Sequence, residues 1–166
     1  MNYKNSLGYE KVSNFYGINT ASRSKLPLMN HVNEGCILLE SLGASQFVLE
    51  AFCLHPILQA TEDFLNAIED DFYESVSSKS LMLAVEYRHV ANSFLSNNVK
   101  ENVLPLINED MRLLLIADKV QNYKDFLRFH KDTHTNSKRL DEYFNDWFKI
   151  LNINYQSIVK PIELLG

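Results

Sequence analysis

The sequence lacks several features that would assign it to a specialised class of protein. No apolar run approaches the roughly 18 residues that a membrane-spanning helix needs. The first five residues lack the apolar core of a secretion signal, so a cytosolic location is expected. There are two cysteines, Cys36 and Cys53, and their spacing matches no metal-binding motif. We expect both to be buried, reduced thiols.

Positive charge is also scarce. The chain carries 16 lysine and arginine residues against 21 aspartate and glutamate residues, giving a formal net charge of −5. A general nucleic-acid-binding protein needs clustered basic residues to neutralise phosphates, so this balance argues against that class. A small anionic ligand remains compatible, because a local basic cluster can oppose the overall sign.

The sequence has no repeat, no low-complexity stretch and no linker, so its 166 residues are expected to form one domain. Apolar residues make up 46% of it, enough for a folded core. No segment alternates apolar and polar residues over six or more positions, which argues against a sheet. We therefore predict an all-α, single-domain bundle of six to seven helices, with its core between about residues 20 and 153.

Capping residues and apolar spacing predict where these helices lie. Asn30 and Ser45 are suitable N-caps, and the acidic pair after Thr61 favours the start of a helix. Pro56 is expected to interrupt the helix that begins after Ser45, because proline lacks the amide donor. The predicted helices cover about residues 30–43, 46–54, 61–76, 78–95, 108–129 and 137–152.

Three polar residues stand in apolar helical contexts, in the order His31, His55 and Asp118. Asp118 follows a run of aliphatic side chains, and a carboxylate there is costly to bury without a metal or a hydrogen-bond partner. Two imidazoles and a carboxylate form a plausible set of ligands for a divalent cation. Taken singly, His31 is better explained as a helix cap and His55 as a hydrogen-bonded core residue, and only the order of all three residues favours a shared site.

The order His … His-x … Ala-Asp-x-x-x-Asn resembles the HD phosphohydrolase superfamily, and within it the RelA/SpoT-type and small alarmone hydrolases. The resemblance covers roughly residues 20 to 150. It implies an HD-type helical bundle that holds a divalent metal, Mn or another transition metal, on His31, His55 and Asp118. It also implies a small phosphorylated ligand, a nucleotide such as a (p)ppGpp-like molecule.

The sequence departs from this family at the motif that names it. Pro56 stands where the family has an aspartate, and Gln59 and Ala60 stand where it has a Glu-Asp pair. Proline has no side-chain donor or acceptor, so it can neither bind a metal nor orient a water. Three outcomes remain open: a weakened metal site, a pocket without metal, or a site in which other residues have taken the catalytic role. The candidates for that role are Gln59, Glu62 and Asp63.

Candidate substrate-binding residues come from the same comparison and from helical spacing. Arg23 and Lys25 lie where alarmone hydrolases carry basic residues that touch the substrate. Asn122 is four residues after Asp118, hence on the same helical face, and Lys119 flanks that face. Arg88 is placed to reach either a substrate phosphate or a buried carboxylate such as Asp118.

Three functions are compatible with these observations. The first is an HD-like metal-dependent phosphohydrolase or phosphate-ester binder. The second is an inactive HD pseudoenzyme that binds a nucleotide or a protein partner, and Pro56 and Ala60 favour it. The third is a helical interaction module without a small-molecule site.

Overall fold

A computed structural model describes residues 3–22, 24–69, 72–97 and 107–165. Within these ranges the chain is helical and contains no strand, the one β contact being an isolated bridge between Thr20 and Pro27. The predicted all-α fold is therefore confirmed. The described residues include seven helices of nine residues or more: α1 (Leu7–Tyr16), α2 (Leu28–Ser41), α3 (Gln46–Gln59), α4 (Thr61–Glu69), α5 (Ser78–Asn97), α6 (Glu109–Asp125) and α7 (Ser137–Ile150).

Shorter helical segments complete the described part of the chain. A 3-10 turn covers Tyr3–Asn5, and a π-helical turn, Phe126–His130, extends α6 toward the loop before α7. Two single-turn helices follow α7, namely α8 (Tyr155–Ile158) and α9 (Lys160–Glu163). None of the helices in the described ranges combines the length and the apolar character that a membrane span requires.

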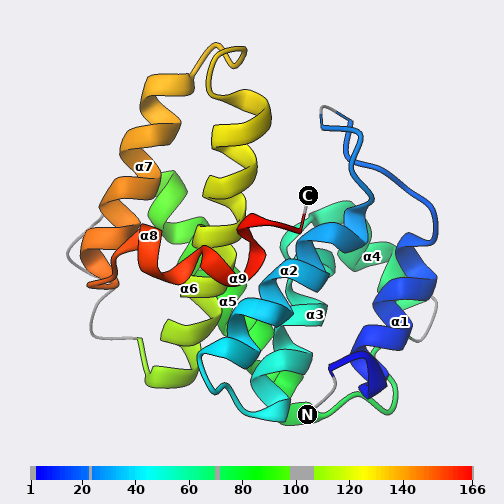
Figure 1. Ribbon diagram of the computed structural model, residues 1–166. Coiled ribbons are helices and arrows are strands. Elements are labelled where there is room, and N and C mark those ends of the chain that lie inside the picture. Colours follow the sequence, from blue (N-terminus) through cyan, green and yellow to red (C-terminus); the bar gives the residue numbers. More distant parts are fainter. Residues whose placement is uncertain (1–2, 23, 70–71, 98–106, 166) are drawn as a thin grey trace.

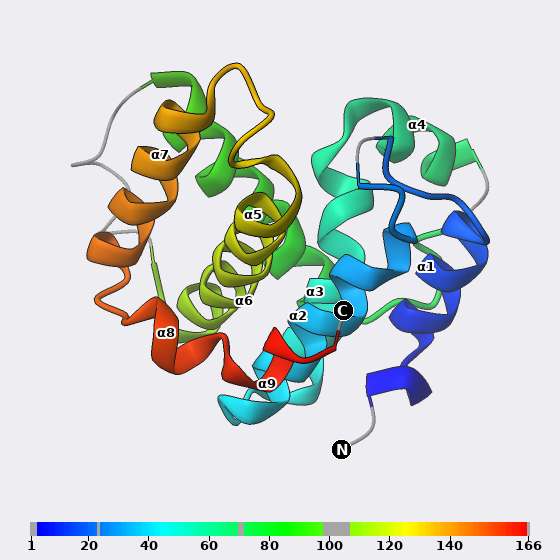
Figure 2. The same ribbon diagram turned by 45° about the horizontal axis from the view of Figure 1, so that its top comes forward.

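Helix α3 lies at the centre of the bundle (Figures 1 and 2). It contacts α1, α2, α4, α5 and α6, and its side chains are buried along nearly its whole length. A helix that is apolar on all sides is stable only when other elements cover it on all sides. This central place puts the end of α3 beside both α2 and α6, which supply the rest of the candidate site.

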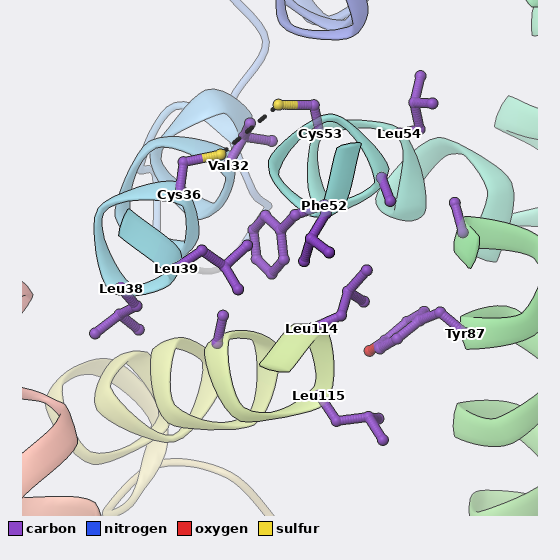
Figure 3. Packing of buried hydrophobic residues seen from close by; sticks show 14 of the residues in the cluster. Val32, Cys36, Leu38, Leu39, Phe52, Cys53, Leu54, Tyr87, Leu114 and Leu115 are labelled. Carbon is purple, nitrogen blue, oxygen red and sulfur yellow. Dashed lines mark hydrogen bonds between the residues drawn. The ribbon is translucent and has the colours of Figure 1, made fainter. Parts of the chain in front are cut away.

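A close approach of α2 to α3 depends on Gly35. A Cβ atom at this position would overlap the ring of Phe52, so only glycine allows the ring to lie against the α2 backbone. Cys36 and Cys53 meet at the same interface, with sulfur atoms 3.7 Å apart (Figure 3). Both are buried free thiols, as expected, and burial raises the pKa of Cys36 well above its ordinary value.

The observed helix limits correct three predictions. The helix expected over about residues 61–76 is shorter, since α4 ends at Glu69 and residues 72–76 are not helical. Helix α2 begins at Leu28, directly after Pro27 and two residues before Asn30, so Asn30 is not its N-cap. Helix α3 does not stop near residue 54 but continues through Pro56 to Gln59. The proline removes one backbone donor, and a side chain compensates for that loss, as described below.

The core also reaches beyond residues 20–153. Helix α1 buries Val12 and Tyr16 against the rest of the bundle, and α9 buries Ile162. The N–H of Gly8, in the first turn of α1, donates to the buried carboxylate of Glu50 in α3. A helix N-terminus stabilises a carboxylate, so this contact fixes α1 on the central helix.

Candidate metal centre

Three helices bring His31, His55 and Asp118 to one point. His31 lies in the first turns of α2, His55 near the end of α3, and Asp118 in the middle of α6. The two Nε2 atoms are 3.2 Å apart, and Oδ1 of Asp118 lies 3.5 Å from that of His31 and 3.3 Å from that of His55. His55 and Asp118 are buried, and the side chain of His31 is 22% exposed. The three residues selected from the sequence therefore form one cluster of possible metal ligands.

The hydrogen bond on the far side of the His55 ring determines its tautomer. Nδ1 lies 2.6 Å from the main-chain carbonyl oxygen of Phe52. A carbonyl oxygen can only accept, so Nδ1 carries the proton and donates. Nε2 of His55 therefore presents a lone pair toward Asp118 and His31.

Gln121 determines the tautomer of His31 in a similar way. Its amide nitrogen lies 3.0 Å from a carboxylate oxygen of Glu34 and 2.8 Å from one of Asp125. Carboxylates accept, so the amide nitrogen must face them and Oε1 must face His31, from whose Nδ1 it is 2.6 Å away. Nδ1 of His31 therefore donates to Gln121, and in the neutral form of this imidazole Nε2 carries the lone pair that faces the cluster.

Three acceptors consequently face one another without a proton between them. Such an arrangement is repulsive unless a cation, either a metal ion or an added proton, lies among the three atoms. Ligand bonds of about 2.0–2.1 Å in a tetrahedral zinc site separate neighbouring ligand atoms by about 3.3–3.4 Å. The observed separations of 3.2, 3.3 and 3.5 Å match one face of such a tetrahedron. The residues present therefore fit a divalent metal.

Asp118 is ionised because two cations or donors hold its carboxylate. Burial would raise its pKa, but the ammonium of Lys119, 2.7 Å from Oδ2, holds the pKa well below its usual range. Oδ1 also accepts a hydrogen bond of 2.8 Å from Nδ2 of Asn122. Burial lowers the pKa of His55, which keeps the imidazole neutral, as a metal ligand must be.

Lys119 is a buried counter-ion. Burial would lower its pKa, yet the Asp118 carboxylate raises that pKa well above the ordinary value, so the ammonium stays charged. Its Nζ lies 3.2 Å from the hydroxyl oxygen of Tyr87, to which it donates. Three aromatic rings surround the charge at 5.4–5.8 Å, those of Tyr87, Tyr143 and Trp147.

A cavity of about 300 Å³ opens onto the cluster. Its lining consists of the three candidate ligands together with Pro56, Gln59, Ala60 and Asn122. In the part of the chain that the structure describes, Asp118 is the one carboxylate in this lining, and no lysine or arginine belongs to it. Comparison with protein-family models, with curated proteins and with solved structures gives no match.

Of the three residues proposed for catalysis, only Gln59 lines the cavity. Glu62 and Asp63 lie in the first turn of α4 and take no part in the lining. Burial, followed by the nearby charge of Glu62, raises the pKa of Asp63 from its ordinary value. The catalytic role predicted for Glu62 and Asp63 therefore has no support from the cavity lining.

The residues proposed for substrate binding lie in different parts of the structure. Asn122 lines the cavity, whereas Lys119 is buried beside Asp118 and does not. Lys25 is exposed, with a φ of 61°, in the loop before α2. Arg23 lies outside the described residues.

Arg88 has a different role from the one expected. Its guanidinium donates to the main-chain oxygen of Leu58 and, at 3.3 Å, to the hydroxyl of Thr61. It also lies over the ring of Phe64, 5.5 Å from the centroid. Arg88 therefore ties the end of α3 to the start of α4, and it neither lines the cavity nor pairs with Asp118.

Sequence reasoning missed the polar group behind His31. Glu34, Gln121 and Lys124 are all buried, and Nζ of Lys124 lies 2.7 Å from Glu34 and 3.0 Å from Asp125. The available signal was weak: Glu34 follows His31 by three residues, so both lie on one face of α2. The pairing of α2 with α6, which brings Gln121 to the histidine, cannot be read from local sequence.

Proposed function

We propose that His31, His55 and Asp118 bind one divalent transition-metal ion, and that the protein acts on a small phosphorylated ligand such as a nucleotide. The activity would be that of an HD-like metal-dependent phosphohydrolase or phosphate-ester binder. The observation that supports this proposal is the triangle of three lone-pair atoms separated by 3.2–3.5 Å. With three protein ligands, such an ion keeps open positions, where it polarises a phosphoryl oxygen and lowers the pKa of a bound water.

The charge balance of the cluster favours an anionic ligand. Lys119 neutralises Asp118, and an imidazole binds a metal in its neutral form, so the protein does not offset the charge of a bound dication. The cavity would then attract a phosphate oxygen although no basic side chain lines it within the described residues. The amides of Gln59 and Asn122 would supply hydrogen bonds to the ligand or to water.

A second candidate is an inactive HD-like protein that binds the same kind of ligand. Pro56 and Gln59 occupy the cavity wall where the resembling enzymes have acidic groups. A glutamine amide cannot take a proton from water, and the basic side chains of the described lining, His31, His55 and Asp118, would all be occupied as metal ligands, so no general base remains for a bound water. This observation favours binding without rapid turnover.

Metal analysis of protein purified without chelators tests the metal site. We expect about one equivalent of a transition metal in the wild type and a large loss in His55→Ala, since three ligands are the usual minimum for such a site. His89→Ala is the matched control, because His89 is exposed on α5 and remote from the cluster in sequence. A wild-type protein that stays metal-free after dialysis against Mn²⁺ and Zn²⁺ would contradict the proposal.

A hydrolysis assay distinguishes the phosphohydrolase from the inactive binding protein. Brisk Mn²⁺-dependent hydrolysis of a (p)ppGpp-like nucleotide or of a chromogenic phosphate ester would support the phosphohydrolase. Binding of the same compounds without hydrolysis would support the inactive alternative.

A further inference from the structure

Pro56 changes the hydrogen bonding of α3 directly beside a candidate metal ligand. In a regular α-helix, the N–H of residue 56 donates to the carbonyl oxygen of Phe52, four residues earlier. Proline has no N–H, so this carbonyl loses its helical partner. Phe52 is fully buried, and a buried carbonyl without a partner is unfavourable.

His55 supplies the missing donor. Its Nδ1 lies 2.6 Å from the Phe52 carbonyl oxygen, which makes a short hydrogen bond. The compensation explains why α3 continues through the proline to Gln59. It also fixes which nitrogen of His55 is protonated, and therefore which one faces Asp118 and His31.

Aromatic packing also helps to orient the His55 ring. The His55 ring lies 4.5 Å from the ring of Phe52 and 4.7 Å from that of Tyr87, measured between centroids. Tyr87 is itself fully buried against Lys119. Two aromatic rings therefore pack against the His55 ring, while the Phe52 carbonyl determines the direction of Nδ1.

We propose that Pro56 is a positioning residue for His55: by leaving the Phe52 carbonyl free, it holds the Nδ1–H tautomer and directs the Nε2 lone pair into the cluster. The tautomer follows from the contacts above, and its use for metal binding rests on the proposed function. Pro56 thus contributes to the site through the backbone, although it has no polar side chain.

The test is Pro56→Ala, which restores a backbone N–H without adding a polar side chain. Alanine favours the helix, so residue 56 would donate to Phe52 and displace Nδ1 of His55. Nitrogen-15 NMR of metal-free protein at about pH 8, above the ordinary histidine pKa, reports the tautomer. We expect the wild type to show protonated Nδ1 and bare Nε2 at His55, and the variant to lose this signature.

Zinc binding gives the second readout. Substitution of groups that orient a ligand typically weakens metal binding by about 10–100-fold, so we expect a Zn²⁺ Kd raised by that factor in Pro56→Ala. The thermal midpoint of the metal-free variant should be equal to or above that of the wild type, because a proline has left a helix interior. If Pro56 served only the stability of α3, its replacement would not weaken Zn²⁺ binding while leaving the thermal midpoint unchanged or higher.

Pro161→Ala is the matched control, since Pro161 is exposed at the start of α9, where its missing N–H costs nothing. It should leave the His55 signature and the Zn²⁺ affinity unchanged. Retention of protonated Nδ1 in Pro56→Ala, with wild-type Zn²⁺ affinity, would overturn the proposal. A wild type that binds no Zn²⁺ while Pro56→Ala still alters the tautomer would refute the metal site and leave the positioning role intact.

Discussion

Lys119 and Asp118 are neighbours in sequence and form a buried ion pair, with Nζ 2.7 Å from Oδ2. Both side chains are at most 5% exposed. The two carboxylate oxygens of Asp118 have different partners. Oδ2 contacts the ammonium, and Oδ1 contacts the two histidines and Asn122. Lys119 therefore keeps Asp118 ionised and oriented without occupying the cavity.

Lys119→Met should destabilise the metal-free protein strongly. Removing one partner of a buried ion pair leaves an uncompensated charge and typically costs about 3–5 kcal/mol. Asp118 would then be available to a cation, so added Zn²⁺ should raise the thermal midpoint more in the variant than in the wild type. Thermal denaturation with and without Zn²⁺ measures both effects, with the exposed Lys149→Met as control. An equal Zn²⁺ shift in variant and wild type would contradict this view of the pair.

Gln121→Leu should weaken metal binding through His31. The variant keeps roughly the same volume but loses the acceptor for Nδ1 and the donor to Glu34 and Asp125. We expect a Zn²⁺ Kd about 10–100-fold higher, the usual effect of removing a group that orients a histidine ligand. Isothermal titration measures it, and the exposed Asn145→Leu on α7 serves as control. Unchanged affinity would show that His31 does not need Gln121 for its orientation.

Gly35→Ala should separate the two histidines. The added Cβ would overlap the Phe52 ring, and overpacking of this kind typically costs about 1–3 kcal/mol. The His31 ring stacks on Phe52, with centroids 5.4 Å apart, so a displaced Phe52 moves one ligand relative to the other. Chemical denaturation and Zn²⁺ titration should both show the loss. The exposed Glu40→Ala on the same helix should change neither property.

Part of the fold and part of the candidate site could be predicted from the sequence. The helical spacing and the order of His31, His55 and Asp118 were visible locally, because each lies on an apolar helical face. Gln121 and Glu34 could not be found in this way, since their contact depends on the pairing of α2 with α6. The continuation of α3 through Pro56 was also missed, because the compensating hydrogen bond comes from a side chain that local helix rules ignore. Arg88 was assigned to the cavity by its charge, whereas its partners lie at the junction of α3 and α4.

Arg88→Met should therefore affect stability and leave ligand binding unchanged. The variant keeps a long side chain over Phe64 but leaves the Leu58 carbonyl without its donor, at a cost of about 1–3 kcal/mol. Zn²⁺ affinity and binding of inorganic phosphate should stay within about twofold of wild type, since Arg88 does not line the cavity. A selective loss of phosphate binding in a fully folded variant would restore the substrate-binding role.

Gln59→Glu tests which group the cavity lacks for catalysis. Gln59 lines the cavity, so a carboxylate there would face water bound at the cluster and could take its proton. We expect metal-dependent hydrolysis of a phosphate ester to rise by about a hundredfold, the low end of what a positioned general base contributes. Pro56→Asp should help less, although it restores the acidic residue of the resembling enzymes, because its new N–H competes with His55 for the Phe52 carbonyl. Glu62→Gln is the control and should have no effect, since Glu62 lies outside the lining. Higher turnover in Pro56→Asp than in Gln59→Glu would mean that a carboxylate at position 56 outweighs the orientation of His55.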